Sequence, residues 1–225
     1  MVSSSPVMIR CKGFLFDMDG ILISSLGSVE RSWTKYAQLR GIDRELAISL
    51  AHGRRAVETI AALRPDLDPD AELKVIEDIE LSDGEDIKVL PGVQSLLAKL
   101  PRARWTVVTS ATERLARMRL AAAGIPVPER LVTAEHVIQG KPDPAPFLAG
   151  AALLGFAPEE CVVFEDSESG VKSGRAAGCI VVGTTFSHSV ESLAAAHHLV
   201  PDLTAISVET AGGEDPVLRF APLPV

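Results

Sequence analysis

The 225-residue sequence predicts an α/β fold, in which a doubly wound parallel sheet carries an inserted helical segment. Short apolar runs rich in Val, Ile and Phe alternate with segments of helical spacing, as in buried parallel strands joined by helices. The alternation stops between about residues 24 and 87, where helical patterns follow one another without a convincing strand. We therefore expect a core domain of residues 1–23 and 88–225 and a helical domain of residues 24–87.

The individual elements follow from the same patterns. Five runs are predicted as strands: CKGFLF (11–16), WTVVT (105–109), RLVT (130–133), ECVVFE (160–165) and GCIVVGT (178–184). Three core helices each end in a glycine suited to a helix C-terminus: 113–124, 143–155 and 168–178. Helical spacing also covers 28–41 and 70–82, and after the insert 89–100 contains a Pro-Gly turn and a helix. The Gly- and Pro-rich tail gives no prediction.

Composition limits the class of protein. With 47% hydrophobic and 23% charged residues the chain is typical of a soluble globular protein, and a net charge of −8 argues against nucleic acid as a partner. No apolar stretch reaches the roughly 18 residues of a membrane helix, and the first residues lack the apolar core of a signal peptide. We expect a cytoplasmic protein with no membrane partner. Cys11, Cys161 and Cys179 are expected to be buried, reduced thiols rather than a disulfide or metal site.

Two pairs of acidic residues follow predicted strands. Asp17 and Asp19 end the run GFLFDMDG, and their spacing places both side chains on one face of an extended strand. Glu165 and Asp166 follow the strand CVVF in the same way. Ligands of doubly wound sheets bind beyond the carboxyl ends of the strands, so these carboxylates are expected to converge. An all-oxygen set without His or Cys at ligand spacing favours Mg²⁺.

A calcium loop is the alternative for Asp17–Asp19. The EF-hand pattern needs an oxygen-bearing residue at position five, Gly at six and Glu at twelve. Those positions hold Ile21, Leu22 and Ser28, which excludes it.

Two loops add anion-binding groups. Ser110 and the backbone N–H groups behind it, including that of Ala111, begin a helix and are suited to an anionic oxygen. The alternative is an ordinary N-cap, which Ser and Thr often supply. Lys141 lies between Gly140 and Pro142 in QGKPDP, where a rigid backbone would fix a cation beside the carboxylates. Taken alone, a loop lysine would simply be solvated.

Together, DMDG, VVTSAT, GKPDP and VVFEDSESG resemble the haloacid dehalogenase superfamily, specifically phosphatases with a helical cap inserted after the first motif. The similarity runs from about residue 12 to about residue 208. With VERSW (29–33) and AHGRRA (51–56), it indicates the sugar-phosphate branch, which includes glycerol-phosphate, 2-deoxyglucose-phosphate and hexitol-phosphate phosphatases. The resemblance implies a Rossmann-like core, a phosphorylated sugar or polyol as substrate, and a monomer or weak homodimer.

The resemblance also implies a role for each motif residue. Asp17 would be the nucleophile and a Mg²⁺ ligand, and Asp19 the general acid and base, with its backbone carbonyl on the metal. Asp166 would bind Mg²⁺, with Glu165 supporting the metal site. Ser110 would bind the phosphoryl group, and Lys141 would neutralise its charge.

The cap loop AHGRRA would read the leaving group, through His52, Gly53, Arg54 and Arg55. Its alternative is an ordinary helix connection with solvated arginines. The first motif departs from the family pattern at Ile21 and at Ser24, where Asp or Asn is usual; this bears on cap closure or substrate preference and not on the chemistry. A phosphomutase using the same residues, or a non-catalytic sugar-phosphate-binding protein, stays an alternative.

Overall fold

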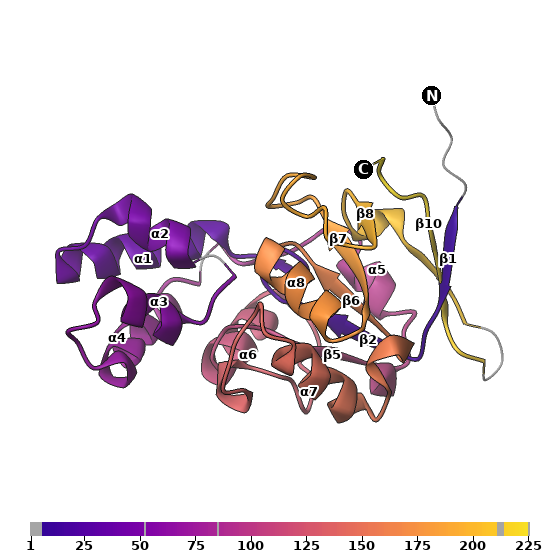
Figure 1. Cartoon of the computed structure of the whole chain (residues 1–225), viewed down its shortest axis with the longest axis horizontal. Helices are drawn as coiled ribbons and strands as arrows, with labels where there is room; N and C mark the ends of the chain where they lie inside the picture. Colours follow the sequence, from indigo (N-terminus) through magenta and orange to yellow (C-terminus); the bar gives the residue numbers. More distant parts are fainter. Residues whose placement is uncertain (1–5, 52, 85, 211–213, 225) are drawn as a thin grey trace.

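A computed structural model describes residues 6–51, 53–84, 86–210 and 214–224. Figure 1 shows an elongated molecule with the helices of the inserted segment at one end and the two larger sheets, together with both chain termini, at the other. Within the described ranges, no helix combines the length and apolar character needed to cross a membrane.

The centre of the molecule is a sheet of five strands in the order β5-β2-β6-β7-β8, with every neighbouring pair parallel. The strands are β2 (Gly13–Phe16), β5 (Trp105–Val107), β6 (Cys161–Glu165), β7 (Ile180–Thr184) and β8 (His198–Val200). β2 lies between two strands that come later in the chain, so the strand order reverses beside it. Such a switch point is where ligands bind in doubly wound sheets. The predicted fold class is confirmed.

Both faces of this sheet are buried, which explains why its strands are apolar without alternation. Phe14 and Phe16 pack into the cluster on one face, whereas Leu15 packs into the cluster on the other. The rings of Phe16 and Phe164 stack with centroids 4.7 Å apart. Helices α7 and α8 cover the Leu15 face, and α5 and α6 contribute to the opposite one. The bounds are α5 (Val93–Leu97), α6 (Glu113–Ala122), α7 (Ala145–Leu154) and α8 (Glu168–Ala176).

A second, antiparallel sheet contains the two ends of the described chain. Its order is β1-β10-β9, formed by β1 (Val7–Arg10), β9 (Ser207–Glu209) and β10 (Val217–Phe220). Ile9 pairs with Leu218, and both side chains join the larger core cluster. None of these strands is predicted, because β1 pairs with a segment at the opposite end of the chain and the tail that contains β10 is rich in Gly and Pro.

One predicted strand is wrong. The segment RLVT makes only an isolated bridge, between Val108 and Val132. The backbone leaves the sheet immediately afterwards, because Thr133 caps a 3₁₀ turn over Ala134–His136. The backbone N–H and the hydroxyl of Thr133 both contact the ring nitrogen Nδ1 of His136, at 3.2 and 2.8 Å.

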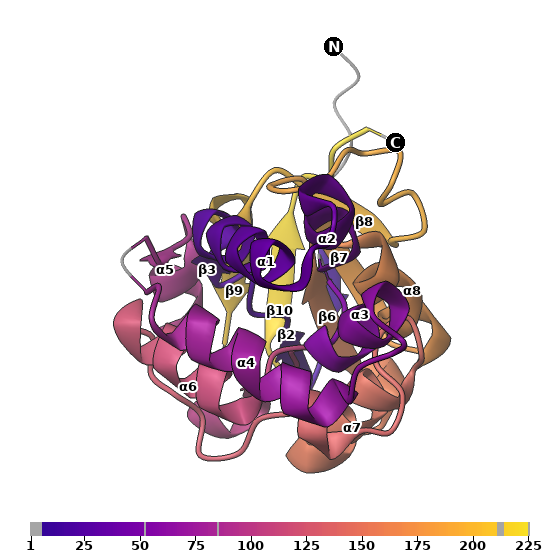
Figure 2. The same cartoon turned by 90° about the vertical axis from the view of Figure 1, so that its left-hand side faces the viewer.

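The inserted segment forms a helical group with its own core, here called the cap: α1 (Leu26–Arg40), α2 (Arg44–Ala51), α3 (Ala56–Leu63) and α4 (Pro69–Leu81). Trp33, Tyr36, Ile60 and Ile76 are buried within it. Figure 2, viewed from the cap side, shows these helices in front of the central sheet.

The chain enters and leaves the cap through a single paired neck. β3 (Ile23–Ser24) and β4 (Lys88–Val89) form a two-stranded antiparallel sheet, with Ser24 opposite Lys88. The neck lies where the sequence predicts the domain boundary, and the assignment of residues 24–87 as a domain stays a prediction.

Candidate active site

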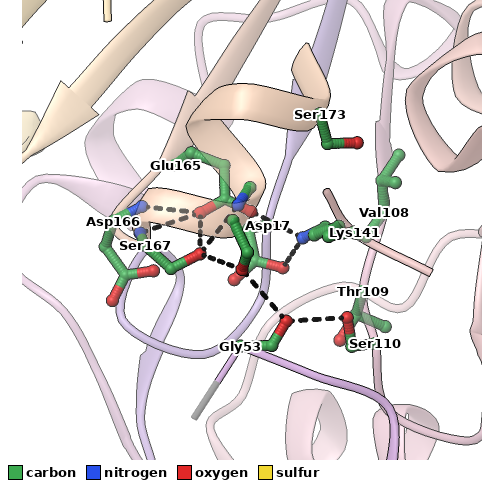
Figure 3. Close-up of polar contacts among 12 residues, drawn as sticks. Asp17, Gly53, Val108, Thr109, Ser110, Lys141, Glu165, Asp166, Ser167 and Ser173 are labelled. Atoms are coloured by element: carbon green, nitrogen blue, oxygen red, sulfur yellow. Dashed lines mark hydrogen bonds and ion pairs between the residues drawn. The ribbon is translucent and has the colours of Figure 1, made fainter. Parts of the chain in front are cut away.

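The site is built around Asp17, the residue that follows β2 at the switch point of the sheet. Its backbone N–H donates to the Phe164 carbonyl at 3.0 Å, which continues the pairing with β6 past the end of the strand. Its carboxylate accepts a hydrogen bond from the Lys141 ammonium at 2.6 Å (Figure 3). Two segments 124 residues apart are thereby joined, as the motif set predicts.

Lys141 is a fixed, buried cation. Its side chain is 2% exposed, and Nζ donates to Asp17 Oδ1 and to Glu165 Oε1, each at 2.6 Å, and to the Val108 carbonyl at 3.2 Å. Burial by itself would lower the pKa of Lys141, but the charges of Asp17 and Glu165 outweigh it and raise the pKa above its usual range. The two carboxylates therefore favour the charged form of the lysine.

Glu165 ends β6 and is completely buried. One carboxylate oxygen accepts from Lys141; the other accepts from the backbone N–H groups of Asp166 and Ser167, at 2.9 and 3.0 Å, and from the Ser167 hydroxyl at 3.0 Å. Both oxygens are thus engaged by the protein. Glu165 holds Lys141 in place and shapes the loop that carries Asp166.

Asp17, Glu165 and Asp166 form a cluster in which one carboxylate oxygen of each lies within 4.8 Å of the others. Burial is the main cause that raises the pKa of Asp17 and of Asp166, and the neighbouring carboxylate charges add to it. One lysine accompanies three acidic groups here, so the fully ionised form of the cluster requires further positive charge. This donor set is all-oxygen and buried, which fits a hard divalent cation such as Mg²⁺.

Asp19 has different partners from Asp17. Its Oδ1 accepts from the Ser25 hydroxyl, and its two oxygens lie 3.2 and 3.3 Å from Nη1 of Arg119 on α6. The side chain is 31% exposed toward the cavity, so the carboxylate is both held and accessible. The two acids of the first motif thus lie beside separate cations.

The cap loop closes over the predicted phosphoryl-binding segment. The Ser110 hydroxyl donates to the Gly53 carbonyl at 3.3 Å, and the Ser169 hydroxyl donates to the same oxygen at 3.4 Å. Gly53 has a φ of +71°, and a Cβ there would lie 3.2 Å from Ser167 Oγ, so glycine permits this approach. The Ala111 N–H donates to Thr109 Oγ1 at 3.1 Å.

The two arginines of the cap loop differ. Arg55 is held by Glu58 and by the carbonyls of Val137 and Ile138, with N···O distances of 2.5 to 2.9 Å. Arg54 is exposed and borders the cavity, and it has no ion pair among the residues that the structure describes. His52, predicted in the same loop, lies outside the described residues.

A single cavity connects these groups between cap and core. The residues that line it include Asp17, Asp19, Gly53, Arg54, Arg55, Ser110, Ala111, Lys141 and Asp166, and Glu165 lies directly behind. The cap supplies an apolar wall formed by Leu26, Val29, Trp33, Val57 and Leu73. The structure therefore brings together the predicted residues that it describes.

Several polar residues near the site are absent from the sequence predictions. Arg119 and Ser25 contact Asp19, Glu80 contacts Arg119, and the Ser187 hydroxyl donates to Asp166. A signal was present for Arg119, which shares the buried stripe of its helix with Leu115, Ala116 and Leu120, and for Glu80, which shares that of α4 with Ile76 and Ile79. A charged residue on an apolar stripe indicates a buried partner.

The sequence profile of the haloacid dehalogenase-like hydrolases matches residues 11–178. The chain belongs to this family. Hexitol phosphatase A of Escherichia coli (strain K12) is 47% identical over 178 residues, covering 77% of this chain and 82% of that protein. Glycerol-1-phosphate phosphohydrolase 2 of Saccharomyces cerevisiae (strain ATCC 204508 / S288c) is 34% identical over 199 residues, covering 82% and 80%. Both names fall in the branch of the family that the motifs indicate.

The haloacid dehalogenase-like fold is also found in solved structures. A β-phosphoglucomutase from Clostridium difficile superposes with a TM-score of 0.74 at 23% identity, covering 86% of this chain and 92% of its own. At that identity the likeness concerns the fold alone. The predicted family and its enzyme class, a hydrolase, are confirmed.

Proposed function

We propose that this chain is a Mg²⁺-dependent phosphatase that hydrolyses a phosphorylated sugar or polyol through an aspartyl-phosphate on Asp17. The observation that carries the proposal is the placement of Asp17, 2.6 Å from Lys141, in one acidic cluster with Asp166, while Asp19 lines the same cavity. The related hexitol and glycerol-1-phosphate phosphatases support the substrate class.

In the first step Asp17 attacks phosphorus, so that an Asp17 O–P bond forms and the P–O bond to the sugar breaks. Asp19 gives its proton to the departing sugar oxygen. In the second step water attacks the same phosphorus, Asp19 takes the proton of that water, and the Asp17 O–P bond breaks. Phosphate and the free carboxylate are released.

The other residues prepare this reaction. Lys141 offsets negative charge on the phosphoryl oxygens, and Ser110 donates a hydrogen bond to them. Asp17, Asp166 and the backbone carbonyl of Asp19 would hold Mg²⁺, with Glu165 behind them. Once bound, the ion supplies positive charge that lets an anionic nucleophile approach an anionic ester. The cap wall excludes bulk water and contacts the sugar.

The test measures phosphate release from hexitol 6-phosphates, glycerol 1-phosphate, 2-deoxyglucose 6-phosphate and nucleoside monophosphates with Mg²⁺ present. We expect hydrolysis of sugar or polyol phosphates in preference to nucleotides. Phosphoryl transfer that needs a bisphosphate activator and releases no phosphate would identify a phosphomutase. Binding of these esters without turnover would identify a non-catalytic protein.

Asp17→Asn should lower kcat by at least about 10³-fold, because the amide is not a nucleophile of comparable strength. Circular dichroism should show an intact fold. The matched control is Asp215→Asn, which makes the same chemical change in an ion pair with Arg104, 2.7 Å long and outside the cavity. Phosphate release by Asp17→Asn at the wild-type rate contradicts the nucleophile, and turnover that persists in excess chelator contradicts the metal.

A further inference from the structure

Arg119 is a buried arginine that links the cap, the core and the first motif. Only 3% of its side chain is exposed. Nη1 donates to Asp19, whereas Nη2 lies 3.3 Å from Oε1 of Glu80, a buried residue of cap helix α4. One guanidinium on a core helix therefore bridges a carboxylate of the cap and a carboxylate of the active site.

Burying Arg119 and Glu80 opposes folding unless their interactions offset the loss of hydration. Burying ions carries a desolvation penalty, and replacing a buried ion pair by apolar residues is often neutral or stabilising. The bridge is also incompletely satisfied, because Nε of Arg119 is a buried donor with no hydrogen-bond partner among the described residues. Burial also raises the pKa of Glu80, to about 6. Stability of the fold alone does not account for these polar groups.

We propose that Arg119 is the positioning residue for Asp19, and that Glu80 couples its position to the packing of α4 against the core. This rests on the proposed function, since it assigns a role relative to the acid and base of that reaction. The Asp19 carboxylate would otherwise turn freely about its side-chain bonds at the cavity edge. Two N–H···O contacts from one guanidinium group, with the Ser25 hydroxyl, hold it in a single orientation.

The chemistry makes this role separable from a merely structural one. An alkyl leaving group, as in a sugar phosphate, needs a proton from Asp19 when the P–O bond breaks. The p-nitrophenolate ion is stable without that proton. Because kcat/KM covers the steps up to release of the alcohol, misplacing Asp19 should lower kcat/KM for alkyl esters selectively.

The experiment compares Arg119→Lys with wild type on p-nitrophenyl phosphate and on the sugar or polyol phosphate that wild type hydrolyses fastest. Lysine keeps the charge but offers a point donor without the planar fork. We expect kcat/KM for the sugar ester to fall between ~10-fold and ~100-fold, which is less than the roughly 10²–10⁴-fold that general acid catalysis contributes, because Asp19 is displaced and not removed. The value for p-nitrophenyl phosphate should fall less than about threefold. Equal losses on both esters, or no loss on either, overturn the proposal.

The matched control is Arg40→Lys. Arg40 pairs with a carboxylate, that of Glu72, through Nε and Nη2 at 2.6 and 3.0 Å, inside the cap and away from Asp19. It should leave the ratio of the two kcat/KM values unchanged. Should Arg119→Lys fold poorly, the double variant Arg119→Gln, Glu80→Gln removes both charges of the buried pair and should show the same selective loss; a wild-type ratio in it also overturns the proposal.

Failure of this inference differs from failure of the proposed function. If wild type hydrolyses neither ester, or Asp17→Asn hydrolyses both, the proposed function is wrong. The proposed function stands if wild type hydrolyses both esters and Asp17→Asn hydrolyses neither. If Arg119→Lys then keeps the wild-type ratio of the two kcat/KM values, only the role of Arg119 is wrong.

Discussion

Gly170, in the first turns of α8, lies directly against the carboxyl group of Glu165. A Cβ at this position would lie 1.7 Å from Glu165 Oε1 and 1.9 Å from its Cδ. Glu165 in turn accepts the hydrogen bond that holds Lys141 beside Asp17. A single hydrogen atom in place of a methyl group therefore lets the buried carboxylate, the lysine and the nucleophile line up.

Gly170→Ala should accordingly displace Glu165 and disturb Lys141. We expect a fall in kcat of at least about 10-fold and a loss of roughly 1–3 kcal/mol in the free energy of unfolding, as for overpacked cores. Steady-state kinetics and denaturant unfolding measure the two effects. Gly84→Ala is the control, because its Cβ would meet nothing closer than 3.7 Å. Wild-type kinetics in Gly170→Ala would contradict the importance of this contact.

At the same scale, the sequence identifies those site residues whose adjacent residues in the chain indicate a functional position. Asp17 and Glu165 stand at the ends of apolar strands, and Lys141 lies between Gly140 and Pro142. Arg119 and Glu80 sit in helical runs with other charged residues, and their significance depends on Asp19, 100 residues before Arg119. Local pattern identifies the strand-end acids but not the partners that orient them.

At the scale of elements, α3 is fastened to the core by its preceding residue. Arg55 reaches from the cap to the carbonyls of Val137 and Ile138 and keeps Glu58 beside it. Neighbouring Arg54 has no such contacts and borders the cavity. We therefore expect Arg55 to contribute to stability and Arg54 to contact the substrate.

Arg55→Met should lower the free energy of unfolding by about 1–3 kcal/mol, because charged hydrogen bonds are lost and a carboxylate is left unpaired. Arg54→Met should leave stability within about 0.5 kcal/mol of wild type. It should raise KM for the sugar phosphate about 10-fold, the effect of losing one charge-assisted hydrogen bond. Thermal unfolding and KM measured on both variants test this pair. The reverse assignment of effects would contradict it.

The elements themselves show why prediction succeeds for some segments and not others. β2, β6 and β7 are buried on both faces, so each is a continuous apolar run that can be identified as a strand from the sequence. β10 is a strand only because β1 and β9 lie on either side of it. RLVT has strand composition, but capping at Thr133 ends its pairing after one residue.

At the scale of the whole molecule, the reactivity of the three cysteine thiols measures whether the core is folded. Cys11, Cys161 and Cys179 are free and buried, as predicted. Burial is the main cause that raises the pKa of Cys11, Cys161 and Cys179 to about 12, 11 and 12. Both the thiolate form and access of a reagent are therefore suppressed in the native state.

Native protein should react with a disulfide reagent such as dithionitrobenzoate only at the rate of unfolding. All three thiols should react at once in concentrated guanidinium chloride. Absorbance of the released thiolate gives both rates, and retained phosphatase activity during the native reaction serves as the control. Rapid modification of any one thiol in active enzyme would contradict the burial described here.

The neck formed by β3 and β4 determines how the cap can be exchanged. The strands run antiparallel, and Ser24 faces Lys88 across the pair, so the chain leaves the core and returns to it at the same point. A short hairpin turn could therefore join Ser24 directly to Lys88 in place of the cap. In topological terms the cap is a side branch: it can be lengthened, shortened or replaced without rerouting any strand of the central sheet. The size and composition of the cap can therefore vary while the strand order that places Asp17 at the switch point of the sheet stays the same.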